Sequence, residues 1–69
     1  MDKKLTLKNN LKEIRQSQNL SQEELACLVG TSRQTIIAIE KNIFNPSTKL
    51  ALLISIALNT TVEKLFYIE

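Results

Sequence analysis

The sequence has no histidine and no tryptophan, and it holds one cysteine, one glycine and one proline. A single thiol without histidine cannot supply the usual zinc ligands, so we expect no metal site. One cysteine also cannot form a disulfide within the chain, which fits a reducing cytoplasm. The scarcity of glycine and proline, together with 43% apolar residues, argues against disorder and predicts a packed core.

Long apolar runs are also missing. The longest, residues 50–54, is far too short to span a bilayer, and the first fifteen residues are charged throughout. No predicted helix combines a cationic face with a wide apolar one, so membrane binding is not expected. There is no Gly-rich phosphate loop, and no pattern pairs the carboxylates in a cleft, so we expect neither an enzyme nor a bound cofactor. These absences predict a cytoplasmic protein.

The length of 69 residues allows a single domain, residues 1–69, whose core would contribute only a few kcal/mol. An oligomer is therefore a reasonable expectation. The net charge of +2 says little, but the cations are concentrated near the start of the chain, where they would favour contact with phosphates. A solvated surface is the alternative reading for any one of them. The cations of this segment are Lys3, Lys4, Lys8, Lys12 and Arg15.

The middle of the chain carries two adjacent helix signals. Ser21 and Glu24 have the spacing of a capping box and begin a helix, which Gly30 ends because glycine readily adopts positive φ. Ser32 then caps another helix, from Arg33 to about Lys41. Because so few residues separate the two helices, they must cross at a large angle, which predicts a helix-turn-helix over about residues 22–41.

The second of these helices has distinct faces. At about 100° per residue, Ile36 and Ile39 point inward, and we expect Ile43 to follow them. Glu40 lies at the edge of the inner face, where a carboxylate needs a partner. The outer face offers a guanidinium, an amide and apolar groups without an acid; it comprises Arg33, Gln34, Ile37, Ala38 and Lys41.

Three further helices are predicted around this pair. Asn9 or Asn10 can cap one that runs to about Gln18, and Thr60 a short one that ends near Leu65. Ser47 caps a helix over Thr48 to about Leu58 that is apolar almost all round. A chain this short cannot bury such a helix completely, so something else must cover part of it.

The two ends of the chain have strand-like patterns. Residues 1–7 alternate weakly, and residues 65–68 contain good strand formers. The fold class is therefore all-α with five helices, to which pairing of the termini would add a short two-stranded antiparallel sheet. An unpaired N-terminal end is the alternative.

Several motifs agree in order with a known pattern over about residues 10–66. They are Leu11-Lys12-x-Ile14-Arg15, Ser21-Gln22-x-x-Leu25-Ala26, Gly30, Ser32-Arg33-Gln34-Thr35-Ile36, Ile39-Glu40, Asn45-Pro46-Ser47 and Glu63-x-Leu65-Phe66. They resemble the phage-repressor/Cro-like (XRE-type) helix-turn-helix transcription regulators, which implies a lambda-repressor-like five-helix DNA-binding domain. In size and in its short extended ends the chain looks most like the small cytolysin-repressor type.

The resemblance implies roles for individual residues. Arg33, Gln34 and Ala38, with Ile37 beside them, match positions that face the bases in the major groove, where Arg suits guanine and Gln suits adenine. Arg15 and Glu40 match a partly buried ion pair. Phosphate-binding candidates are Gln22, Ser32, Thr35, Lys41 and Asn42.

Apolar residues at positions where this family is usually polar suggest a second surface. Leu53 and Ile56, joined by Phe66, Tyr67 and Ile68, are expected to form a homodimer interface. The leading hypothesis is a homodimeric repressor that binds double-stranded DNA at a palindromic operator. The alternative is an antitoxin-type module that uses the apolar helix to neutralise a partner toxin.

Overall fold

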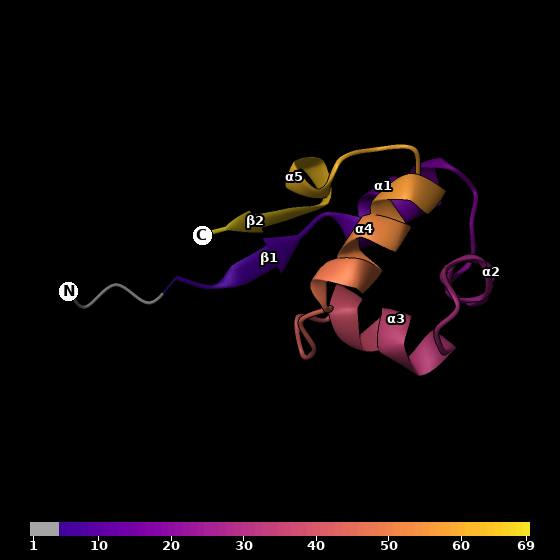
Figure 1. The fold of residues 1–69 in the computed structure, drawn as a ribbon, viewed down its shortest axis with the longest axis horizontal. Helices are drawn as coiled ribbons and strands as arrows, with labels where there is room; N and C mark the ends of the chain where they lie inside the picture. The colour runs from indigo at the N-terminus through magenta and orange to yellow at the C-terminus, as the bar shows by residue number, and fades with distance from the viewer. Residues whose placement is uncertain (1–4) are drawn as a thin grey trace.

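The computed structural model describes residues 5–69 and contains five helices and two strands (Figure 1). The predicted all-α class with a small antiparallel sheet is confirmed. No helix in this part of the chain is long and apolar enough to cross a membrane. The elements in order are β1 (Leu7–Asn9), α1 (Leu11–Ser17), α2 (Gln22–Val29), α3 (Arg33–Glu40), α4 (Thr48–Ala57), α5 (Val62–Leu65) and β2 (Phe66–Ile68).

The starts of α2, α3 and α4 follow the capping signals, whereas the cap residue of α1, Asn10, makes no side-chain cap hydrogen bond. The Ser21 hydroxyl accepts from the Glu24 amide at 2.9 Å, and the Glu24 carboxylate accepts from the Ser21 amide at 2.8 Å. The Ser21 backbone amide, and secondly its hydroxyl, lower the pKa of Glu24. The predicted cap of α5 at Thr60 is wrong: the Thr60 amide closes α4 by donating to the Ser55 carbonyl at 2.9 Å. Thr61, in extended conformation, caps α5 instead.

Four helices end at a residue with left-handed backbone, namely Asn19, Gly30, Asn42 and Asn59. In each case the next amide bonds to a carbonyl five residues back, which satisfies an end group of the helix. The expectation that Ile43 points inward is wrong for this reason. Because Asn42 has a left-handed backbone with φ 60°, Ile43 no longer follows the inward spacing of α3, and its side chain is 75% exposed.

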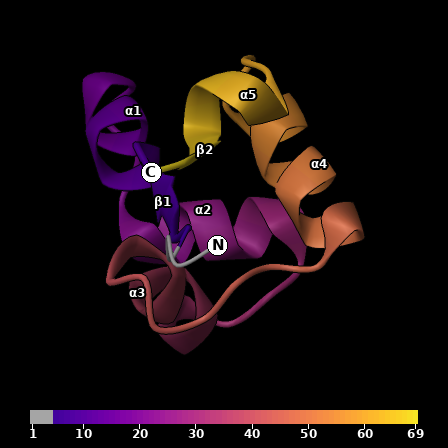
Figure 2. The ribbon, with the colours of Figure 1, turned by 90° about the vertical axis from the view of Figure 1, so that its left-hand side faces the viewer.

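Side chains from all five helices, together with Phe66 of β2, form the core. Figure 2 shows α2 behind the strands, with α1 and α4 on its two sides and α3 below it. Seven side chains are fully buried, and each such burial contributes on the order of 1.5–3 kcal/mol. The fully buried side chains are Leu11, Leu25, Ile36, Ile39, Ile54, Leu58 and Leu65.

The two strands extend from the helical body on one side (Figure 1). They pair antiparallel, with Leu7 opposite Ile68 and Asn9 opposite Phe66, and Thr6 and Glu69 exchange two further backbone hydrogen bonds at 2.9 Å. The first strand was expected within residues 1–7, but it begins at Leu7. Residues 1–4 of that prediction lie outside the described residues. Pairing starts next to α1 because the Asn10 amide donates to the Leu65 carbonyl at 2.8 Å.

A buried ion pair fixes α3 relative to the two preceding helices. Nε of Arg15 donates to Oε2 of Glu40 at 2.7 Å, and the two side chains are only 8% and 4% exposed. A second guanidinium nitrogen donates to the Leu20 carbonyl at 2.8 Å, in the turn that leads to α2. The pair therefore joins α1, the α1–α2 turn and the last residue of α3.

Removing one partner of this pair should unfold much of the protein. Glu40→Gln leaves the Arg15 cation buried without its counter-charge, a loss of about 3–5 kcal/mol. The measurement is urea unfolding followed by circular dichroism. Glu23→Gln removes an exposed carboxylate and should change stability by less than about 0.5 kcal/mol. The double variant Arg15→Met/Glu40→Leu should be more stable than Glu40→Gln; equal stability of the two would contradict this account.

Candidate nucleic-acid interface

The outward face of α3 carries the side chains predicted to read DNA. Arg33, Gln34 and Lys41 are exposed, and Ile37 and Ala38 are half-buried. The face has no acid because Glu40, the acidic residue of α3, turns inward to Arg15. A helix face with guanidinium, amide and ammonium groups and no carboxylate suits contact with bases and phosphates.

Two phosphate candidates lie together at the beginning of α3. The hydroxyls of Ser32 and Thr35 are 3.0 Å apart, and the Ser32 hydroxyl also accepts from the Thr35 amide at 3.2 Å. Ser32 therefore caps α3 and brings the Thr35 hydroxyl to its exposed start. Both groups lie beside Arg33, the first residue of the helix.

The Gln22 side chain extends the ion pair to α2. Its amide nitrogen donates to Oε1 of Glu40 at 3.1 Å. Because that nitrogen carries two hydrogens, one remains to donate elsewhere. Gln22 is also the first residue of α2, and the first backbone amides of a helix have no acceptor within the helix. The contact with Glu40 thus fixes a donor group at a helix N-terminus.

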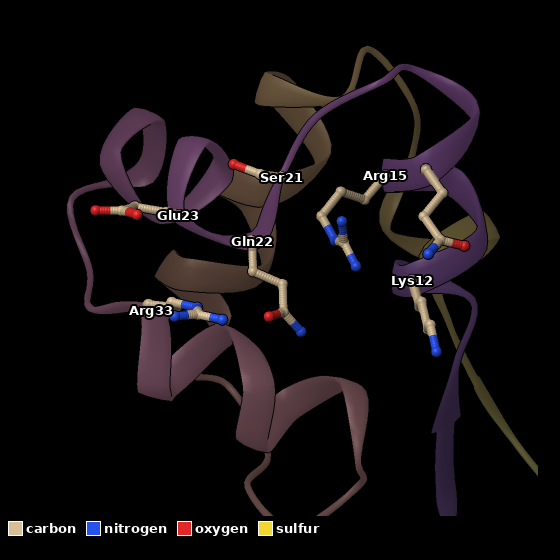
Figure 3. A pocket seen from close by; sticks show the side chains of 7 residues that line it. Lys12, Arg15, Ser21, Gln22, Glu23 and Arg33 are labelled. Carbon is tan, nitrogen blue, oxygen red and sulfur yellow. The ribbon is translucent and has the colours of Figure 1, made fainter.

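These groups border a hollow of about 490 Å³ between α1 and the starts of α2 and α3, hereafter the basic hollow. Figure 3 shows Gln22 and Arg15 directed into the space between α1 and α3, with Lys12 on α1 and Arg33 at the start of α3. Since Glu40 neutralises Arg15, the remaining charged side chains that line the hollow are those of Lys12, Arg33 and Glu23. The lining residues are Lys12, Arg15, Gln16, Ser21, Gln22, Glu23 and Arg33.

Gln16 was not among the predicted site residues, and Lys12 was named only as one of the N-terminal cations that would favour phosphate contact. They lie four residues apart on α1, so they share a face of the helix and both reach the basic hollow. That spacing was visible in the sequence. The location of the hollow was not, because it depends on how α1 packs against α3.

Asn42, the remaining phosphate candidate, follows the C-terminal end of α3. It is exposed, and its side-chain oxygen accepts from the amide nitrogen of Asn9 at 3.0 Å. Asn9 was expected only as a helix cap. Its oxygen does accept from the Leu11 amide at 3.1 Å, although Asn10 occupies the cap position.

The predicted dimer residues occupy different environments. Ile56 is 73% exposed on α4, whereas Leu53 is half-buried against the core. Leu52, four residues before Ile56 and 49% exposed, was missed although this spacing puts the two on one helix face. The prediction that Phe66 lies at the dimer interface is wrong, because Phe66 is 9% exposed and belongs to the core of its own subunit.

The exposed side of α4 continues toward the sheet. A second hollow of about 410 Å³, the apolar hollow, separates Leu52 from the core residue Phe66. Since successive residues of a strand alternate in direction, Ile68 shares a face with Phe66, and Tyr67 projects from the other face. The lining residues are Leu7, Pro46, Thr48, Ala51, Leu52, Val62, Glu63 and Phe66.

Comparison with known proteins agrees with this geometry. The helix-turn-helix family model matches residues 11–65. An uncharacterized HTH-type transcriptional regulator of Methanocaldococcus jannaschii is 49% identical over 63 residues, 91% of this chain and 96% of the relative. Control protein C.SmaI of Serratia marcescens is 38% identical over 65 residues, which cover 94% of this chain and 77% of that protein.

A solved structure has the same fold. The restriction-modification controller protein C.AhdI from Aeromonas hydrophila superposes with a TM-score of 0.74 and 33% sequence identity, covering 78% of each chain. The resemblance inferred from the sequence motifs is thereby confirmed. The chain belongs to the XRE-type helix-turn-helix family of DNA-binding transcriptional regulators.

Proposed function

We propose that this regulator is a homodimeric repressor that reads a palindromic operator with α3 in the major groove. The observation that carries the proposal is the acid-free outward face of α3, on which Arg33 and Gln34 are exposed while Glu40 is buried in its ion pair. Arg can bond bidentately to guanine O6 and N7, and Gln to adenine N6 and N7. Ala38 and Ile37 offer apolar contact to a thymine methyl.

Phosphate contacts would flank this face on both sides. At the start of α3 the basic hollow offers Gln22 and Lys12. At its C-terminal end Lys41 and Asn42 are exposed. Contacts at both ends would fix the register of the helix in the groove, whereas the base-facing residues would select the sequence. Ser32 and Thr35 add hydroxyl donors near the first set.

The exposed apolar surface of α4 supports a homodimer. Leu52, Ile56 and the apolar hollow, with Ile68 at the sheet, leave apolar groups in water that a second copy would cover. Tyr67, which is 40% exposed, projects from the other face of the sheet. Two-fold symmetry would place the two α3 helices about 34 Å apart, one turn of DNA, which requires an operator with two inverted half-sites.

Gln34→Ala should reduce sequence discrimination. Loss of a bidentate base contact should weaken binding to the preferred duplex about 5- to 150-fold, with little effect on a scrambled duplex. The measurement is fluorescence anisotropy at two salt concentrations with DNA from upstream of the gene that encodes this protein. Gln22→Ala, the matched control, should weaken both duplexes by a similar factor because phosphates carry no sequence information. Wild-type protein without preference for any duplex would refute the proposed function.

Ile56→Glu should convert the dimer to a monomer, because a carboxylate would be buried without a partner at the interface. Sedimentation velocity without DNA measures this directly. Ile43→Glu is the matched control, since Ile43 is 75% exposed against 73% for Ile56 and lies in the loop after α3. The control should remain dimeric. Monomeric wild-type protein at micromolar concentration, or equal effects of both substitutions, would contradict this interface.

The same apolar surface could instead contact a toxin, as the alternative hypothesis holds. That use predicts a complex of fixed stoichiometry with a different protein, disrupted by Ile56→Glu and not by Ile43→Glu. Coexpression with the product of the neighbouring gene, followed by sedimentation, distinguishes the two. A homodimer that binds DNA without a second protein supports the repressor.

A further inference from the structure

We propose that Asn9 is a positioning residue for DNA binding: its side chain holds the C-terminal end of α3 and turns the amide nitrogen of Asn42 toward the DNA backbone. The inference rests on the proposed function, since it concerns how one phosphate contact of that function is oriented. Asn9 lies in β1, and it is 30 residues from Ile39 and 33 residues from Asn42 in the sequence.

The Asn9 side chain makes three hydrogen bonds to three different segments. Its oxygen accepts from the Leu11 amide at 3.1 Å, at the start of α1. Its nitrogen donates to the Ile39 carbonyl at 2.9 Å, in the last turn of α3, and to the Asn42 side-chain oxygen at 3.0 Å. Both amide hydrogens and one acceptor site are therefore used.

These hydrogen bonds are compatible with only one orientation of each of the two side-chain amides, that of Asn9 and that of Asn42. The Leu11 backbone N–H can only donate and the Ile39 carbonyl can only accept, so the oxygen and nitrogen of Asn9 cannot exchange places. With its nitrogen fixed as the donor, Asn9 needs an oxygen from Asn42. The Asn42 nitrogen is then directed away from Asn9, and no residue among 5–69 accepts a hydrogen bond from it.

That orientation suits a phosphate. Phosphate oxygens accept hydrogen bonds and cannot donate them, so an exposed asparagine contacts a phosphate through its nitrogen. A freely rotating Asn42 would present oxygen and nitrogen alternately. Because Asn9 holds the Asn42 side chain in one orientation before DNA binds, less side-chain entropy is lost on binding.

Asn9 itself is well placed to act as an anchor. Its backbone pairs with Phe66 in the sheet, and the next amide, that of Asn10, donates to the Leu65 carbonyl at 2.8 Å. Through the bond to Ile39, the end of α3 is thus attached to the sheet, while Arg15 attaches Glu40 to α1. The two contacts fix the orientation of the helix that carries Gln34.

Asn9→Asp separates the positioning role from helix capping. The aspartate keeps the oxygen that accepts from the Leu11 amide. Its second oxygen replaces the donor nitrogen and faces the Ile39 carbonyl oxygen and the Asn42 side-chain oxygen. Asn42 would then rotate to donate to Asp, presenting its own oxygen to the phosphate. Asn10→Asp is the matched control, because the Asn10 nitrogen also donates to a backbone carbonyl, that of Lys64 at 3.1 Å, but on the α5 side. Both variants change the net charge equally.

The experiment uses the full chain and a duplex selected from a random pool by the wild-type protein. Asn9→Asp should raise Kd about tenfold or more relative to Asn10→Asp, the usual effect of losing a hydrogen bond to a charged group, and circular dichroism checks that both variants are folded. In an Asn42→Ala background the effect of Asn9→Asp should fall to about twofold, since contacting residues are not additive. Asn9→Ser, which adds no charge, provides a second variant for the same comparison.

Three results would overturn the proposal: equal losses for Asn9→Asp and Asn10→Asp, an undiminished effect of Asn9→Asp in the Asn42→Ala background, or an unchanged Asn42 side-chain amide resonance in the NMR spectrum of Asn9→Asp. The NMR measurement needs no DNA. If the wild-type protein selects no duplex, the proposed function fails, and the amide resonance still decides whether Asn9 orients Asn42.

Discussion

The ion pair between Arg15 and Glu40 is the contact on which the arrangement of the helix-turn-helix depends. Apolar packing in a core this small is poorly directional, whereas a guanidinium between a carboxylate and the Leu20 carbonyl specifies both distance and angle. A buried charge costs several kcal/mol if it loses its partner, so alternative positions of α3 are disfavoured. Gln22 brings α2 into the same network. Three helices are therefore fixed by one network, of which Arg15 and Gln22 also line the basic hollow.

Burial of Glu40 has an electrostatic consequence for the rest of the surface. It removes the carboxylate of α3 from the face that would approach DNA, so the exposed groups there are cationic or neutral. Exposed apolar side chains on α4 and in the sheet, namely Leu52, Ile56, Tyr67 and Ile68, lie outside this face, while Leu28 on α2 and Ile43 and Phe44 after α3 are exposed as well. The outward face of α3 thus suits phosphates and bases, and the exposed apolar side chains of α4 suit contact with protein. Asn9 lies between them, in the sheet by its backbone and against α3 by its side chain.

Local signals in the sequence predicted most of the fold, because they act over a few residues. Ser21 with Glu24, Ser32, Ser47 and Gly30 define helix ends by chemistry that needs no tertiary contact. Errors arose where a neighbour decided the outcome. Thr60 closes α4 and cannot cap α5, Asn42 ends the spacing that Ile43 was expected to follow, and the Phe66 side chain packs inward from the sheet into the core. The role of Asn9 depends on contacts with residues 30 and 33 positions away, which no periodicity in the sequence contains.

Three of the four left-handed helix ends are occupied by asparagine, and only one by glycine. Substitutions at these positions are constrained by backbone shape, since residues other than glycine, asparagine and aspartate pay about 1–2 kcal/mol there. Replacement of Asn19 or Asn59 by glycine should therefore be tolerated, because glycine adopts the same left-handed backbone and leaves every helix length intact. At Asn42 the same exchange would preserve the turn and delete the side chain that Asn9 orients. Substitution at that one position would thus remove the proposed phosphate contact while the fold stayed the same.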